Sequence, residues 1–305
     1  MINNEFRGAI CAIFSGFLYG FIAYFGLNAL SSHFNEGAML FWRFSLSCIF
    51  ILIFFFPWLR QKRESPKELW RLLIAGIFCY GTSSLLYFLA CRYISSGIAM
   101  VSFFTYPLFI MLYNILFKRQ AVVPLYFGAM LVMMLGMCCF IDLRTAQANV
   151  VGIFLAMASA ICYAAYILTS KRSTVSPHMS TLMVCAGCTI PALVHCLVDN
   201  SLAWPASSIA WFYLFGIAII STVLPILFLL YSLQLISAEK ASLLSVLEPV
   251  FVVILGMVLL HEKLSLKSLA GIILVLAGAL ITLLESNPQS GQTVYKEKLD
   301  MSQQY

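Results

Sequence analysis

The apolar stretch at residues 236–260, ISAEKASLLSVLEPVFVVILGMVLL, repeats a stretch found earlier in the chain. The earlier stretch is residues 94–118, ISSGIAMVSFFTYPLFIMLYNILFK, and the two align at a shift of 142 with Pro107 on Pro249. A helix rises 1.5 Å per residue, so a hydrocarbon core of about 30 Å needs about 20 apolar residues. Each stretch is therefore long enough to cross a bilayer as one helix.

The same repeat extends over both halves of the chain. At a shift of 144 it matches Gly8, Ala12, Ser15 and Tyr19 with Gly152, Ala156, Ser159 and Tyr163, and at a shift of 142 it matches Ala99 with Ala241, Phe109 with Phe251 and Gly136 with Gly278. If each half has five spans, an odd number, the second half enters the bilayer from the opposite side. Such inverted repeats are typical of carriers that alternate access around a midplane site. Duplication for assembly alone would leave the same pattern.

The composition is that of a membrane protein. Of the 305 residues 62% are apolar and only 10% charged, whereas a soluble domain has roughly half apolar and a quarter charged residues. We predict an all-α integral membrane protein with ten transmembrane helices, at residues 8–29, 38–58, 71–91, 96–117, 123–141, 150–170, 180–198, 209–232, 238–260 and 266–285. Residues 1–141 and 142–285 then form the two inverted five-helix repeats, followed by a flexible cytoplasmic tail at 286–305.

The positive charges predict the orientation. Thirteen Lys and Arg residues fall in the N-terminus, alternate loops and the C-terminus, whereas the opposite loops hold Arg92, Arg144, Lys263 and Lys267. The positive-inside rule then places both termini in the cytoplasm, and we expect the inner (plasma) membrane. The formal charge of +6 is not clustered as a nucleic-acid patch would be, so we predict no nucleic-acid partner.

Two charged residues inside predicted spans are candidates for function, because charges are costly in a bilayer. Glu248 precedes Pro249, which removes a backbone donor and favours a kink that exposes polar backbone. This carboxylate can bind a cationic group or exchange a proton, or it can pair with another helix. Arg43 suits a substrate carboxylate or phosphate; it can equally pair with Glu248 or extend to the interface. Pro107 and Pro249 are the candidate hinges.

Tyrosines supply the other candidate binding residues. Tyr19 and Tyr163 occupy equivalent repeat positions, and Tyr106 is the repeat equivalent of Glu248. Tyr87 also lies well inside a span. Aromatic rings with a polar group suit cationic or ring-bearing ligands. We therefore predict a substrate site made of Tyr19, Tyr87, Tyr106, Tyr163 and Glu248.

Other classes of protein fit less well. His261-Glu262-Lys263-Leu264-Ser265 begins like a metalloprotease helix but has Ser where the second His ligand belongs, and no nucleophile elbow or nucleotide-binding loop appears. We predict no enzyme activity, no metal and no cofactor. A channel, which would need a ring of filter residues, is the remaining alternative to a carrier. Oligomeric state and proton coupling stay open.

These features resemble the EamA family of the drug/metabolite transporter superfamily over residues 7–285. The resemblance rests on Glu248-Pro249-Val250, His261-Glu262-Lys263-Leu264-Ser265, Gly271 and Gly278, with Tyr19 and Arg43 in the first half. One departure concerns Gln120, the first-half counterpart of Glu262. Many relatives have an acidic residue at this position. The resemblance implies a secondary transporter, often an exporter, with a central cavity. It implies little about the small-molecule substrate, because members handle amino acids, nucleotide-related metabolites and other organic solutes; a cation such as S-adenosylmethionine is a further candidate.

Overall fold

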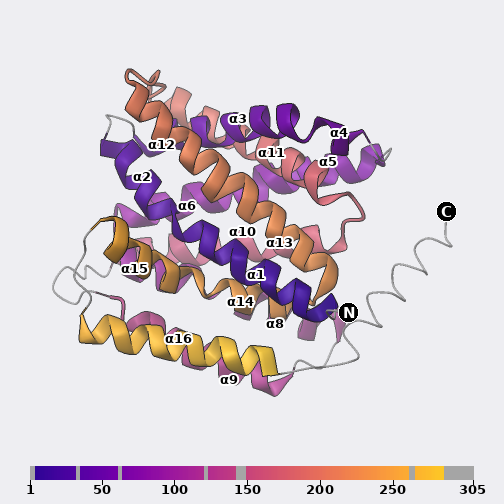
Figure 1. Cartoon of the computed structure of the whole chain (residues 1–305), viewed down its shortest axis with the longest axis vertical. Coiled ribbons are helices and arrows are strands. Elements are labelled where there is room, and N and C mark those ends of the chain that lie inside the picture. The colour runs from indigo at the N-terminus through magenta and orange to yellow at the C-terminus, as the bar shows by residue number, and fades with distance from the viewer. Residues whose placement is uncertain are drawn as a thin grey trace.

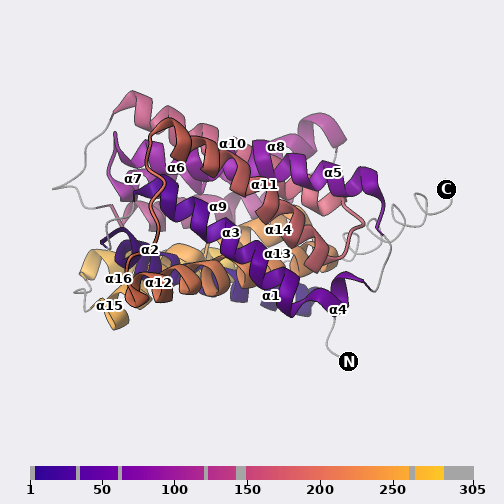
Figure 2. The ribbon, with the colours of Figure 1, turned by 90° about the horizontal axis from the view of Figure 1, so that it is seen from above.

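The computed structural model describes residues 4–31, 35–60, 64–119, 123–141, 149–260 and 265–284. The predicted tail at 286–305 and the residues Gln120 and Glu262 lie outside these ranges. Every regular element among the described residues is helical, and the helices run side by side across the molecule (Figures 1 and 2). The predicted all-α membrane fold is therefore confirmed.

Helices are present at all ten predicted spans. Among the described residues nine spans are long and apolar enough to cross a bilayer, and the tenth, α9, is a shorter apolar helix. The elements are α1 (Asn4–Gly20) and α2 (Ile22–Ser31); α3 (Glu36–Phe54) and the short α4 (Phe56–Leu59); α5 (Pro66–Ala75), η1 (Gly76–Gly81) and α6 (Thr82–Cys91); α7 (Ser96–Phe103) and α8 (Tyr106–Lys118); α9 (Pro124–Cys138); α10 (Val150–Arg172); α11 (Pro177–Val198); α12 (Ser208–Ala218), η2 (Ile219–Val223) and α13 (Leu224–Leu235); α14 (Ala238–Ser245) and α15 (Glu248–Leu259); and α16 (Leu266–Leu284).

One edge of the bundle carries most of the positive charge. Here α1 begins and α16 ends, at the right-hand side of Figure 1, and we call this edge the N-terminal face. The described Lys and Arg residues at helix ends on this face are Arg7, Arg60, Lys67, Arg71, Lys118, Arg119, Lys171, Arg172 and Lys240. The opposite ends carry Arg92 and Lys267.

The fourth and ninth spans are broken at matched positions. Two residues separate the end of α7 from Tyr106-Pro107, and two residues separate the end of α14 from Glu248-Pro249. Tight i to i−3 bonds close both turns: Leu247 N–H donates to Leu244 O at 3.2 Å, and Thr105 N–H to Ser102 O at 3.4 Å. Proline lacks an N–H and is tolerated only in the first turn of a helix. The predicted hinges are thus full breaks in the helix rather than kinks.

The third and eighth spans are also irregular at matched positions. Each contains a π-helical segment, η1 at Gly76–Gly81 and η2 at Ile219–Val223, which coincide at the repeat shift of 142. Such segments widen the helical turn, leave backbone carbonyls unpaired within the helix and occur often at functional sites.

The two halves interlock through equivalent contacts. Ser15 Oγ of α1 donates to Pro225 O of α13 at 2.8 Å, and Ser159 Oγ of α10 donates to Ser83 O of α6 at 2.8 Å. Ser15 and Ser159 are repeat equivalents, and so are Pro225 and Ser83. The first helix of each half therefore packs against the third span of the other half.

Glycines allow α9 and α16 to pack as a close pair at the lower edge of Figure 1. A Cβ added to Gly271 would lie 2.7 Å from Gly136 O, and one added to Gly136 would lie 2.8 Å from Gly271 O. Small residues at such crossings let helix backbones approach closely, which is a main source of packing energy in a bilayer.

We expect Gly271→Ala to lower the free energy of unfolding by about 1–3 kcal/mol, because the new methyl group meets backbone that cannot yield easily. The melting temperature of the purified protein in detergent measures this effect. Gly128→Ala on α9 is the matched control, since a Cβ there meets no atom within 4 Å. Equal melting temperatures for the two variants would contradict the role of this crossing.

Candidate functional site

Five tyrosines meet in the centre of the bundle, and we call them the tyrosine cluster: Tyr19, Tyr80, Tyr106, Tyr163 and Tyr166. Each is at most 7% exposed. The hydroxyls of Tyr19 and Tyr80 are 3.2 Å apart, within hydrogen-bond distance. Ring centroids are 4.8 Å apart for Tyr106 and Tyr163, and 5.0 Å apart for Tyr80 and Tyr166. The cluster joins both halves, because its members come from α1, η1, α8 and α10.

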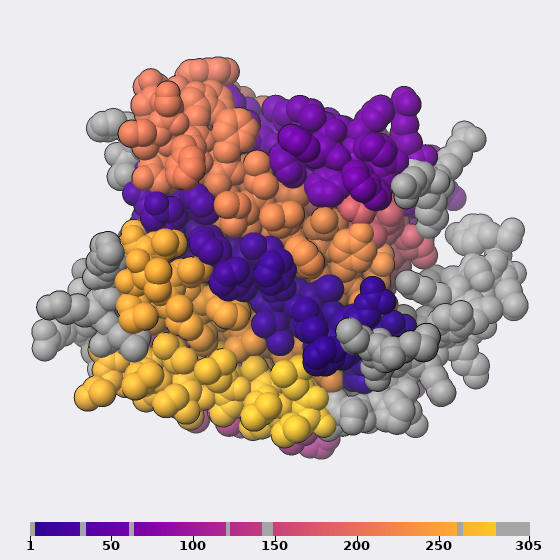
Figure 3. Space-filling model, viewed as in Figure 1, coloured from indigo at the N-terminus to yellow at the C-terminus, as the bar shows by residue number. Residues whose placement is uncertain are grey.

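The structure brings together three of the four tyrosines predicted for the site. Tyr19, Tyr106 and Tyr163 belong to the cluster, while Tyr87 is only half-buried and reaches it through Phe103, 5.4 Å away between ring centroids. Phe103 in turn lies 5.2 Å from Tyr163. Figure 3 shows α1, which carries Tyr19, packed across one face of the molecule between α13 and α15.

Tyr80 and Tyr166 were not among the predicted site residues. Tyr166 follows Tyr163 by three residues, so helical spacing places both on one face of α10. Tyr80 belongs to η1, whose widened turn has no clear signal in the sequence beyond the glycines at its two ends. Helical periodicity could have assigned Tyr166 to the site, whereas the inward position of Tyr80 is seen only in the three-dimensional structure.

Glu248 places a carboxylate beside the cluster. It is the first residue of α15, where the break in the ninth span ends, and it lies within electrostatic range of Tyr87, Tyr106 and Tyr163. A carboxylate at a helix N-terminus also interacts favourably with the helix dipole. Glu248 is partly exposed, and it forms no hydrogen bond or ion pair with any residue that the structure describes. An acid within a predicted span therefore lies next to aromatic rings without a partner among the described residues.

Arg43 is held by the irregular backbone of η2. The side chain is 3% exposed; its Nε donates to Thr222 Oγ1 at 2.6 Å and its Nη2 to Ser221 O at 3.1 Å. It lies within electrostatic range of Glu248, but no ion pair joins these two described residues. Of the predicted alternatives, neither a salt bridge with Glu248 nor extension to the interface is observed.

The site offers one carboxylate, one guanidinium and several phenol groups within a few helices of each other. Carboxylates and aromatic faces both attract a cationic group, the latter through the ring quadrupole, while guanidinium suits a carboxylate. Within the described ranges no group of three or more His, Cys, Asp or Glu residues is arranged to hold a metal ion. The carboxylate, the guanidinium and the phenol groups can all bind a polar or charged solute reversibly.

We expect Thr222→Val to lower the free energy of unfolding by about 1–3 kcal/mol, because it leaves the Arg43 Nε–H buried without its acceptor. Thr282→Val is the matched control: Thr282 is equally buried, and its hydroxyl donates to Gly278 O within its own helix. Removing such a local bond costs little. Thermal unfolding in detergent measures both, and equal losses would argue against a specific role of the Arg43 contact.

Comparison with known proteins agrees with this architecture. The sequence model of the EamA-like transporter family matches residues 6–141 and again residues 150–284. The chain is 27% identical over 270 residues to the threonine/homoserine exporter RhtA of Salmonella typhimurium (strain SL1344), covering 83% of this chain and 84% of the exporter. It is 30% identical over 224 residues to an uncharacterized transporter of Archaeoglobus fulgidus, covering 72% and 79%.

A solved structure shows the same fold. It superposes on this chain with a TM-score of 0.77 at 16% identity, covering 91% of this chain and 98% of that one. The two matches of the family model together span nearly the whole chain, one on each half. The chain therefore belongs to the EamA-like transporter family.

Proposed function

We propose that the protein is a secondary transporter that moves a small organic metabolite with a positively charged group by alternating access. The observation that carries this proposal is Glu248: a partly exposed carboxylate without a described partner, placed at a helix break beside aromatic rings. A charge is retained at such a depth when it serves a site or pathway. A substrate ammonium group would supply the partner that the protein does not.

Amino acids are the first substrate class to test. RhtA is named as an exporter of threonine and homoserine, and both are zwitterions whose ammonium group suits Glu248. Arg43 would attract the substrate carboxylate while staying anchored to η2, since only its Nε and Nη2 are engaged there. S-adenosylmethionine and nucleotide-related cations are the next classes.

The inverted repeats would supply the movement. In this proposal the repeats at residues 1–141 and 142–285 rearrange around the tyrosine cluster, and the breaks at Pro107 and Pro249 let the half-helices α7, α8, α14 and α15 move independently. Discontinuous helices that meet at the midplane are typical of carriers built in this way. We place the protein in the inner (plasma) membrane with both termini in the cytoplasm, acting as exporter or exchanger without chemical change of the substrate.

Counterflow into proteoliposomes tests the proposal. Vesicles that contain the purified protein are preloaded with unlabelled threonine, homoserine or S-adenosylmethionine, and the labelled compound is added outside. We expect transient accumulation of one tracer above protein-free vesicles, because the unlabelled substrate inside competes with the tracer for the carrier and slows the exit of the tracer. Flux that neither saturates nor shows counterflow, together with single-channel conductance, would show a channel instead.

We expect Glu248→Gln to raise the half-saturating concentration of the transported substrate by about tenfold to a hundredfold. The amide keeps the shape of the side chain but loses the charge, and a hydrogen bond to a charged group contributes about 1.5–3 kcal/mol. Glu68→Gln is the matched control, because Glu68 pairs with Arg71 at the surface at 3.4 Å. If Glu248→Gln left the affinity for the substrate unchanged, Glu248 would not belong to the substrate site.

A further inference from the structure

A row of hydroxyl groups on α10 leads from the tyrosine cluster to the N-terminal face. Tyr163, Tyr166 and Ser170 follow one another at spacings of three and four residues, which places them on one side of the helix. Tyr163 and Tyr166 belong to the cluster, with ring centroids 5.6 Å apart. Ser170 lies one turn closer to the N-terminal face.

The two outer members of this row form no well-aligned hydrogen bond with a described residue. Tyr166 is completely buried and Ser170 is 7% exposed, and their hydroxyls interact only weakly with each other. Leaving a buried hydroxyl unsatisfied costs roughly 1–3 kcal/mol. Such groups persist where water or a polar solute reaches them. Their succession along one helix indicates a polar route rather than one isolated defect.

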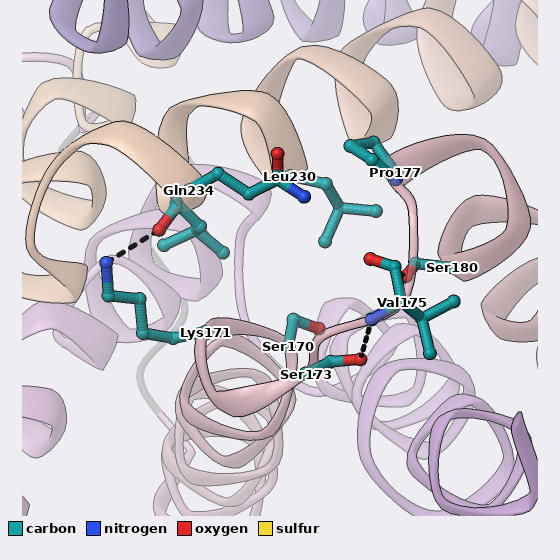
Figure 4. A pocket seen from close by; sticks show the side chains of 9 residues that line it. Ser170, Lys171, Ser173, Val175, Pro177, Ser180, Leu230 and Gln234 are labelled. Carbon is teal, nitrogen blue, oxygen red and sulfur yellow. Dashed lines mark hydrogen bonds between the residues drawn. The ribbon is translucent and has the colours of Figure 1, made fainter. Parts of the chain in front are cut away.

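The row ends in a small pocket, which we call the Ser170 pocket. Figure 4 shows its lining by Ser170, Lys171, Ser173 and Ser180 on one side and by Leu230 and Gln234 of α13 on the other. Its volume of about 20 Å³ holds one water molecule but no metabolite. The route is therefore closed at this point in the present conformation.

Lys171 is the residue that holds the closed end together. Its ammonium donates to Leu233 O at 2.6 Å and to Ile236 O at 2.7 Å, so it ties the end of α10 to the end of α13 beside the pocket. A second link on this face joins Glu5 of α1 to Lys240 of α14 at 2.8 Å.

The opposite face lacks the equivalents of these links. At the repeat shifts, Lys171 corresponds to Leu27, and the pair Glu5 and Lys240 corresponds to Asn149 and Ile98. A leucine cannot donate to carbonyls, and asparagine with isoleucine cannot form an ion pair. These two links are thus specific to the N-terminal face. The described part of the opposite face has different ones, which pair Arg92 with Glu36 at 3.2 Å and join Lys267 Nζ to Ile141 O at 2.9 Å.

We propose that the row Tyr163–Tyr166–Ser170 is the path by which the cationic substrate passes between the tyrosine cluster and the N-terminal face, and that Lys171 is the latch that closes its mouth. This inference rests on the proposed transport function and names its pathway on one side. Opening requires that α10 and α13 separate where Lys171 joins them. The Ser170 pocket then widens into a channel continuous with the cluster.

Cysteine accessibility tests the latch without any substrate. Ser170→Cys is treated in proteoliposomes with methanethiosulfonate ethyltrimethylammonium, a small cation, and modification at residue 170 is followed by mass spectrometry. We expect Lys171→Met to raise the modification rate by at least about tenfold, since it removes two charge-assisted bonds of the closed state. Lys171→Arg, which can still donate to both carbonyls, should keep the rate near that of Ser170→Cys alone.

Gly26→Cys is the matched control on the other face, because Gly26 is the repeat equivalent of Ser170 and a Cβ there meets only ordinary contacts at 3.7 Å or more. In an alternating mechanism Lys171→Met slows modification at residue 26 while it speeds modification at residue 170.

Faster modification at both sites would show general loosening, and unchanged modification at residue 170 would show a structural water site; either result overturns the latch. A counterflow failure with reciprocal accessibility would refute the proposed substrates and leave the latch standing.

Discussion

Every backbone N–H and C=O that enters a bilayer must find its partner inside the protein, and this constraint governs where the chain departs from the α-helix. The π segments show how it is met. Thr82 Oγ1 donates to Ile77 O at 3.0 Å in η1, and Thr222 Oγ1 donates to Ile217 O at 2.7 Å at η2. Both bonds span five residues, so in each half a threonine satisfies a carbonyl at the widened turn, although the two threonines do not occupy equivalent repeat positions. Arg43 satisfies a further one, Ser221 O.

Because these irregularities are costly, their position is informative. All four, the two π segments and the two breaks, lie in the spans that surround the tyrosine cluster, whereas α9 and α16 at the edge of the bundle are unbroken. The irregular segments supply Tyr80, Thr222, Tyr106 and Glu248 to the centre. The regular pair supplies close packing through glycines instead. The polar side chains in the centre of the bundle are thus found where the backbone departs from the regular α-helix.

The sequence predicted those features that depend on neighbouring residues. Hydropathy located all ten helical spans, and the matched prolines located both breaks, since each signal lies within one segment. The sequence could not predict the partner of Arg43, because Thr222 lies 179 positions away and belongs to the other half. Tyr80 was not assigned to the site for a related reason: its inward position depends on the π turn, where Gly76 packs closely against α11, far away in the sequence.

The differences between the halves have a thermodynamic consequence. In the proposed alternating mechanism, identical halves would make the inward- and outward-facing states equivalent by two-fold rotation and therefore equal in free energy. Here the halves differ: Tyr106 occupies the repeat position of Glu248, and Leu27 occupies that of Lys171. Each charge-assisted bond that exists on one face alone favours closure of that face by a factor of roughly ten or more. A substrate can reverse this preference only by its differential affinity for the two states, so the asymmetric residues, rather than the shared scaffold, set the resting conformation.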